Sequence, residues 1–94
     1  MSTELKDKVK DSGTTLGPPF NVILFNDSSH SFDEVIHQIV ATIKCSPSRA
    51  SDLANEADSK GQAIVFTGTL EVCELKDMIL SGPPAALVTN IEPA

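Results

Sequence analysis

A cluster of polar side chains at residues 26–30 is the part of this sequence best suited to binding or chemistry. It reads Asn-Asp-Ser-Ser-His and directly follows an apolar run, which would hold it in place. An anionic carboxylate beside an amide oxygen suits a cationic amine, and the apolar Phe32 and Val35 just beyond could line a pocket for a side chain. The alternative is a turn in which Asn26 and Asp27 cap the next helix. The residues alone leave both interpretations open.

Patterns for catalysis or metal binding are weak. The sequence has no glycine-rich phosphate loop, Cys-x-x-Cys pair, His-Glu-x-x-His motif or nucleophile elbow. His37 and Cys45 follow His30, but a Cys/His arrangement of this kind arises often by chance in a short chain. The candidate metal ligands His30, Asp27 and Asp58 have no recognised spacing. We therefore expect a protein that is not an enzyme and that carries neither a metal nor a cofactor.

Length and charge exclude further classes of function. The 94 residues suffice for one small domain, and 13 acidic against 7 basic residues give a net charge of −6. Nucleic acids and anionic membranes attract basic surfaces, so we expect neither as a partner. No apolar run approaches the ~20 residues of a membrane span, and two cysteines without a signal segment favour a reducing compartment. These features predict a cytoplasmic monomer.

The chain divides into a polar N-terminal part and a globular part. Residues 1–19 mix Lys with acidic residues and then pass through Gly and Pro, without an apolar stripe that could dock on anything. We interpret them as a flexible N-terminal arm and residues 20–94 as a single domain.

Six elements are expected to position the polar cluster. A β-branched apolar run at 20–25 predicts a central strand, and a capping box of Ser31 and Glu34 begins a helix that ends near residue 45. The remaining patterns predict a helix over 47–59, a strand over 62–67, a helix capped by Thr67 or Thr69 that ends at Gly82, and a strand over 85–91. The order β-α-α-β-α-β predicts an α+β fold, with three helices on one face of a small three-stranded antiparallel sheet.

The second and third helices differ in the faces that they are expected to bury. The second helix has a narrow face of small side chains, which permits close packing or leaves space: Ala50, Leu53, Ala54 and Ala57. The buried face predicted for the third helix is larger: Val72, Leu75, Met78 and Ile79.

Four segments together carry a resemblance to a known family. They are the strand 20–25 with its Asn26-Asp27 end, Ser-Arg-Ala at 48–50, Lys-Gly-Gln-Ala-Ile at 60–64 and Gly-Thr-Leu-Glu-Val-Cys-Glu-Leu-Lys at 68–76. In this order they resemble the bacterial ClpS adaptor family, from about residue 20 to the C-terminus, with a shortened turn near residues 83–84. The resemblance implies the same α+β fold. It also implies an adaptor that delivers proteins with destabilising N-terminal residues, such as Leu, Phe, Tyr and Trp, to a Clp AAA+ unfoldase and its peptidase.

The resemblance assigns roles to individual positions. Asn26 and Asp27 match the pair that binds the α-amino group of the peptide, and Asp58 stands where the family has a histidine with the same task. The resemblance, together with the small residues of the second helix, implies an apolar pocket for the first side chain: Phe32 at the usual gating methionine, Val35, Ala54, Ala57 and Leu87. Residues 1–19 correspond to the arm that engages the unfoldase. Glu71 and Lys76 match positions on the face that docks it.

Three positions depart from the family pattern, namely Ser28 in place of a second acidic residue, Ala54 in place of a bulky methionine, and Asp58. The carboxylate of Asp58 can still pair with an ammonium, and the alternative is a solvated residue near a helix end. Ala54 and Ala57 would enlarge the pocket, so that a wider or β-branched side chain could enter. The leading hypothesis is an adaptor for such N-degrons. The alternative is a divergent paralogue that docks on the unfoldase as a regulator without binding N-degrons.

Overall fold

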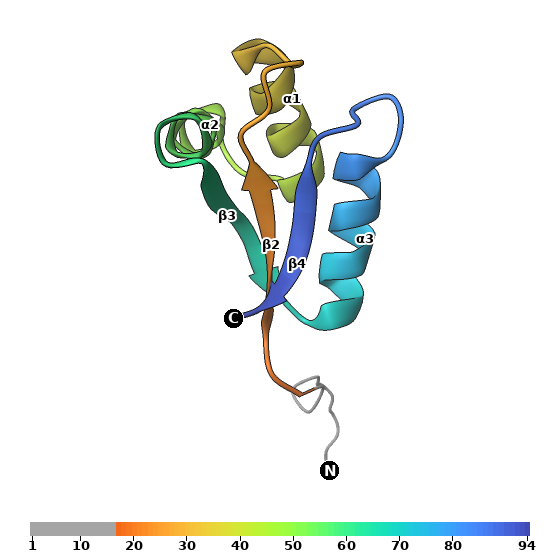
Figure 1. The fold of residues 1–94 in the computed structure, drawn as a ribbon. Coiled ribbons are helices and arrows are strands. Elements are labelled where there is room, and N and C mark those ends of the chain that lie inside the picture. The colour runs from red at the N-terminus through yellow and green to blue at the C-terminus, as the bar shows by residue number, and fades with distance from the viewer. Residues whose placement is uncertain (1–16) are drawn as a thin grey trace.

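The structure is a computed structural model that describes residues 17–94. Its elements follow the expected order β-α-α-β-α-β: β2 (Phe20–Phe25), α1 (Phe32–Ile43), α2 (Pro47–Lys60), β3 (Gln62–Gly68), α3 (Leu70–Ser81) and β4 (Thr89–Pro93) (Figure 1). The predicted fold class is therefore confirmed. Most of the expected N-terminal arm, residues 1–16, lies outside the described part of the chain.

The sheet is antiparallel throughout, and its strand order is β3-β2-β4. The central position of β2 is confirmed, because Val22 pairs with Phe66 of β3 on one side and with Ile91 of β4 on the other. A central strand has no free edge, which suits the continuous apolar run of β2. The polar segment that follows β2 therefore begins at a rigid point of the molecule.

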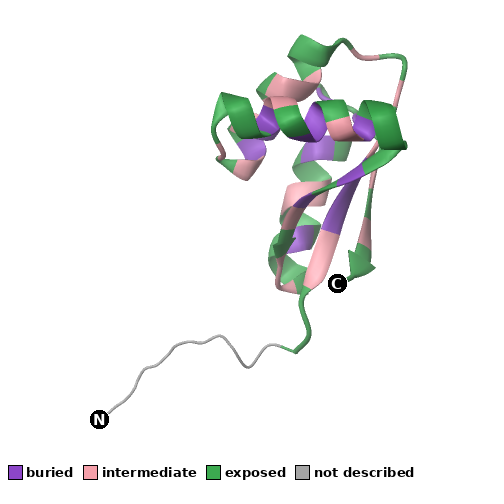
Figure 2. Ribbon diagram, turned by 90° about the vertical axis from the view of Figure 1, so that its left-hand side faces the viewer, coloured by how far each residue is buried: buried purple, intermediate pink, exposed green. Residues whose placement is uncertain are grey.

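The three helices cover one face of the sheet (Figures 1 and 2). Val22 and Leu24 of β2 point into this layer and join the fully buried side chains of the helices, among them Ile39, Leu53 and Leu80. Burial of an aliphatic side chain of this size contributes about 1.5–3 kcal/mol, so this layer is the main source of stability. None of the helices in the described part of the chain is long and apolar enough to cross a membrane.

Side-chain caps begin all three helices. Ser31 and Glu34 form the predicted capping box of α1, and Ser46 accepts from the backbone N–H of Arg49 at the start of α2. The cap of α3 is Thr69. These caps satisfy backbone N–H groups that have no partner inside a helix, which fixes where each helix begins.

The last strand begins later than predicted, at Thr89 rather than at residue 85. Ala86 has a φ of 51°, which is incompatible with an extended strand. The backbone N–H groups of Ala86 and Leu87 donate instead to the carbonyls of Gly82 and Leu80, so the segment folds back over the end of α3. This turn places Leu87 inside the protein, where it is 4% exposed.

The predicted buried face of α3 is wrong. Its four members are all substantially exposed: Val72 (39%), Leu75 (52%), Met78 (65%) and Ile79 (47%). Cys73 and Leu80 are buried instead, seven residues apart on the opposite side of the helix. The helix thus carries two apolar stripes. The stripe with Cys73 faces the sheet, because this small side chain lets the helix approach β2 closely. Cys73 Sγ lies 3.3 Å from the carbonyl oxygen of Phe20, the first residue of β2.

Candidate functional site

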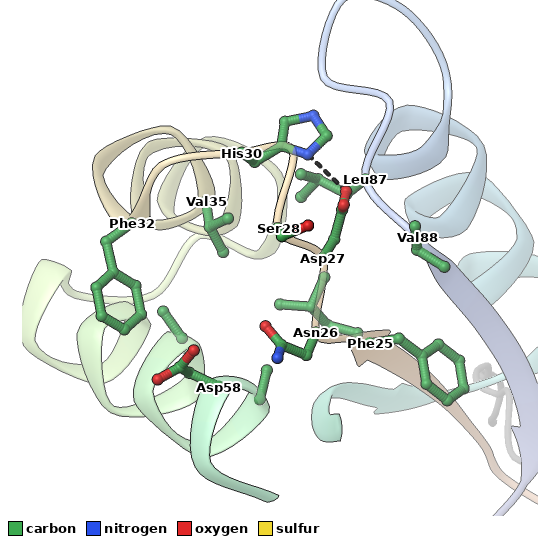
Figure 3. A pocket seen from close by; sticks show the side chains of 13 residues that line it. Phe25, Asn26, Asp27, Ser28, His30, Phe32, Val35, Asp58, Leu87 and Val88 are labelled. Atoms are coloured by element: carbon green, nitrogen blue, oxygen red, sulfur yellow. Dashed lines mark hydrogen bonds and ion pairs between the residues drawn. The ribbon is translucent and has the colours of Figure 1, made fainter. Parts of the chain in front are cut away.

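A cavity of about 230 Å³ lies between the end of β2, the start of α1, the middle of α2 and the segment before β4 (Figure 3). Its walls come from four parts of the chain that are distant in sequence: Leu24, Phe25, Asn26, Asp27, Ser28, His30, Phe32, Val35, Ala54, Ala57, Asp58, Leu87 and Val88. A cavity with an apolar floor and a few convergent polar groups is the usual form of a small binding site.

All eight residues predicted to bind a terminal residue line this one cavity. Three are the polar residues proposed for the amine: Asn26, Asp27 and Asp58. Five are the predicted pocket residues: Phe32, Val35, Ala54, Ala57 and Leu87. The structure therefore brings the predicted set together, while the binding role of each residue stays a prediction.

The apolar side of the cavity has a buried floor and an open edge. Ala54 and Ala57 of α2 and Leu87 are each less than 5% exposed, whereas Phe32 is 46% exposed. In Figure 3 the ring of Phe32 stands at the side of the cavity. The small side chains of α2 thus leave room for a side chain that comes from outside.

Asp27 is held by its own loop. Its Oδ1 accepts from the backbone N–H of Ser29 at 2.9 Å, and the hydroxyl of Ser29 lies within 2.9 Å of both carboxylate oxygens. Its Oδ2 lies 2.7 Å from Nδ1 of His30. These hydrogen bonds lower the pKa of Asp27, chiefly the one from the Ser29 backbone. Asp27 therefore does not cap α1, a task that Ser31 performs.

His30 bridges this loop to the other wall of the cavity. Its Nε2 lies 2.7 Å from the backbone oxygen of Ala85, 55 residues away, and its Nδ1 faces Asp27. A carbonyl oxygen and an ionised carboxylate only accept hydrogen bonds, so both ring nitrogens must donate and the imidazole is protonated in this arrangement. The pKa of His30 is accordingly raised, mainly by the hydrogen bond to Asp27. His30 and Asp27 thus form a neutralised ion pair.

Asp58 lies in the last turn of α2 and is exposed. Figure 3 shows its side chain on the cavity edge between Phe32 and Asn26, with the Asn26 amide directed toward the same space. No hydrogen bond or ion pair within residues 17–94 engages its carboxylate. A cation in the cavity would therefore meet an unneutralised carboxylate on this side and an amide on the other.

The family model described as ATP-dependent Clp protease adaptor protein ClpS matches residues 16–83, which is more than half of the chain. The chain belongs to the ClpS family. Of 72 residues aligned with E3 ubiquitin-protein ligase UBR1 from Drosophila melanogaster, 32% are identical, and they cover 77% of this chain but only 4% of that ligase. A solved structure, Agrobacterium tumefaciens ClpS2 bound to L-phenylalaninamide, has the same fold, with a TM-score of 0.74, 20% identity, and coverage of 82% of this chain and 98% of that one.

The resemblance to the ClpS family assigned no role to His30, which contacts both Asp27 and the backbone oxygen of Ala85. Its acceptor Ala85 lies in the turn that replaces the start of the predicted last strand, so no local pattern links the two residues. The spacing of Asp27 and His30, three residues apart in a polar loop, was the one available signal. Val88 also lines the cavity without having been named as a candidate, and it belongs to the same misassigned segment.

The two residues of the predicted ClpS docking face differ in their surroundings. Glu71 is exposed in the first turn of α3. Lys76 is half-buried, because its Nζ donates to the carbonyl oxygen of Thr42 in α1 at 2.7 Å and lies 5.7 Å from the centre of the Phe66 ring. Lys76 therefore joins α3 to α1 and the sheet in addition to any role on the surface.

The catalytic and metal candidates are dispersed. His37 and Cys45 are not among the residues that line the cavity, and Cys45 is a free thiol near the end of α1. Within residues 17–94, no three His, Cys, Asp or Glu side chains are grouped so that they could hold a metal ion. The cavity combines the carboxylates of Asp27 and Asp58 and the amide of Asn26 with an apolar floor.

Proposed function

We propose that this ClpS-family protein binds the N-terminal residue of other proteins and delivers them to a Clp AAA+ unfoldase for degradation. It acts as a cytoplasmic adaptor and not as an enzyme. The observation that carries the proposal is the cavity itself, in which an amide and a carboxylate stand beside an apolar floor. An N-terminal residue is the one part of a protein that offers an ammonium and a side chain on the same carbon atom.

The apolar half of the cavity supports a preference for bulky first residues. Its floor is formed by the buried Leu87, Ala54 and Ala57, and Phe32 stands at the open edge. Alanine side chains on the floor leave more space than long side chains would, so they exclude large or branched first residues less strongly. We therefore expect Leu, Phe, Tyr and Trp to bind, and the β-branched Ile and Val to bind as well.

The outer face of α3 supports docking on a second protein. Leu75, Met78 and Ile79 are 52%, 65% and 47% exposed, on the side of the helix opposite the buried Cys73 and Leu80. Apolar side chains gathered on a surface often mark a protein interface. With the nearby carboxylate of Glu71, this face is where we expect the N-terminal domain of the unfoldase to bind.

Peptide binding by fluorescence anisotropy tests the first half of the proposal. Labelled peptides that begin with Leu, Phe, Tyr, Trp, Ile or Val are each compared with the N-acetylated form of the same peptide. We expect binding of the free forms only, because acetylation removes the ammonium and leaves the side chain unchanged. Equal binding of both forms, or no binding of either, would falsify N-terminal recognition.

A pulldown with a Clp N-terminal domain tests delivery separately from cargo binding. Glu71→Ala should reduce capture of the domain, and Glu56→Ala on α2 is the control for loss of one carboxylate. If Glu71→Ala and wild type are captured equally, α3 is not the docking face.

The second candidate is a regulator that docks on the unfoldase without binding N-degrons. It is favoured by the involvement of Asp27 in its own loop, since that carboxylate is already neutralised by His30. The same two assays separate the candidates. A regulator is captured by the Clp domain but does not distinguish free from acetylated peptides.

A further inference from the structure

We infer that Asp58 of α2, and not Asp27, supplies the negative charge that attracts the ammonium of the bound residue. This inference rests on the proposed function and specifies which side of the cavity the ammonium occupies. Asn26 then provides the neutral acceptor on the opposite side.

The first argument concerns the acceptor capacity of Asp27. A carboxylate has about four lone-pair positions. Oδ1 receives the Ser29 N–H, Oδ2 receives the His30 Nδ1–H, and the Ser29 hydroxyl proton lies between the two oxygens. In Figure 3 the carboxylate is directed toward His30 and away from the space between Phe32 and Asn26. These three donors leave at most one of the four positions of Asp27 for an ammonium.

The second argument concerns charge. Because both ring nitrogens of His30 donate, the imidazolium cancels the charge of Asp27, and the loop carries no net charge toward the cavity. Glu34 also faces His30 from α1, where its carboxylate accepts from the backbone N–H of Ser31 in the capping box. Of the residues that line the cavity, Asp58 is then the one whose negative charge is not neutralised by a described neighbour.

The third argument concerns the end of α2. Asp58 lies three residues before the C-cap Gly61, so its charge adds to the partial negative charge of the helix C-terminus. A carboxylate at this end is unfavourable in the free protein, and a cation placed there relieves the repulsion. The end of α2 therefore favours a cationic ligand through both the side chain and the backbone.

The test is a comparison of peptide affinities by anisotropy for four proteins: wild type, Asp58→Asn, Asp58→Glu and Asp52→Asn. Asp52 is also an exposed carboxylate of α2, but it does not line the cavity, so it controls for a change in overall charge. Each protein is titrated with a Leu-initiated peptide and with its acetylated form. Circular dichroism melts of all four verify that the fold is retained.

We expect Asp58→Asn to weaken binding of the free peptide about tenfold, the loss typical of one charged hydrogen bond. Binding of the acetylated peptide should stay as weak as in wild type, so the preference for a free terminus should shrink by the same factor. Asp58→Glu should retain most of the affinity, and Asp52→Asn all of it. Raising the salt from about 50 to about 500 mM should weaken binding to wild type more than to Asp58→Asn.

Two outcomes would contradict different claims. If wild type prefers the free peptide but Asp58→Asn binds it within about twofold of wild type, the assignment to Asp58 is wrong while N-terminal recognition stands. If wild type itself does not prefer the free peptide, N-terminal recognition fails and the assignment fails with it.

Discussion

Lys76 links three elements of the protein, and its removal should lower stability by a predictable amount. Its Nζ donates to the carbonyl oxygen of Thr42 at 2.7 Å, in the last turn of α1, where carbonyls have no partner within the helix. It also lies 5.7 Å from the centre of the Phe66 ring of β3. A net hydrogen bond contributes about 0.5–1.5 kcal/mol and a partly exposed cation–π contact about 0.5–1 kcal/mol.

Lys76→Met keeps an unbranched side chain of similar length and removes the ammonium. From these two contacts we expect a loss of about 1–2 kcal/mol in the free energy of unfolding. A domain of this size loses roughly 4–8 °C in Tm for each kcal/mol, so the expected decrease is roughly 5–15 °C. The measurement is thermal and urea unfolding followed by circular dichroism.

Arg49→Met is the matched control, because Arg49 is an exposed cation in the first turn of α2. Its removal should change the free energy of unfolding by less than about 0.5 kcal/mol. A Tm for Lys76→Met within about 2 °C of the control would refute the structural role of the ammonium. A confirmed loss would also mean that pulldowns with Lys76 variants report on folding as well as on docking, and that Glu71 is the better probe.

Two further changes test the cavity and its loop. Ala54→Met should fill part of the cavity, so peptides that begin with Trp or Ile should lose more affinity than one that begins with Leu. The affinities are measured by anisotropy titration. An equal loss for all three peptides would contradict the predicted position of the first side chain of the peptide beside Ala54. His30→Ala should destabilise the protein more at about pH 5.5 than at about pH 8.5. Folding raises the pKa of His30 above its unfolded value near 6.5, so the protonated imidazole stabilises the folded protein at low pH. This stabilisation disappears as the pH rises through the pKa that His30 has in the folded protein. A Tm difference from wild type that is the same at both pH values would show that His30 does not titrate in this bridge.

Much of the fold and of the cavity was predictable because the signals are local. The capping box of Ser31 and Glu34 satisfies its own backbone, and the run at 20–25 is apolar throughout, as a central strand requires. The position of the polar cluster after that strand follows from these two elements. The spacing of small residues on α2 likewise predicts which of its side chains face inward, and Ala54 and Ala57 are buried as expected.

Other features depend on contacts between residues that are distant in sequence. On α3 two apolar stripes compete, and the stripe with Cys73 is buried because the small side chain allows a close approach to β2, which no helix pattern reveals. The last strand is shortened because Ala86 folds back on the end of α3.

The sequence by itself determined where the first two helices and the first two strands begin, which residues could form a binding cavity, and the family to which they point, because caps, periodicity and motif spacing act over a few residues. Only the tertiary structure decided the charge of that cavity. His30 is brought to Ala85 across 55 residues, becomes a double donor and neutralises Asp27. Asp58 then remains as the carboxylate of the cavity that no described neighbour neutralises.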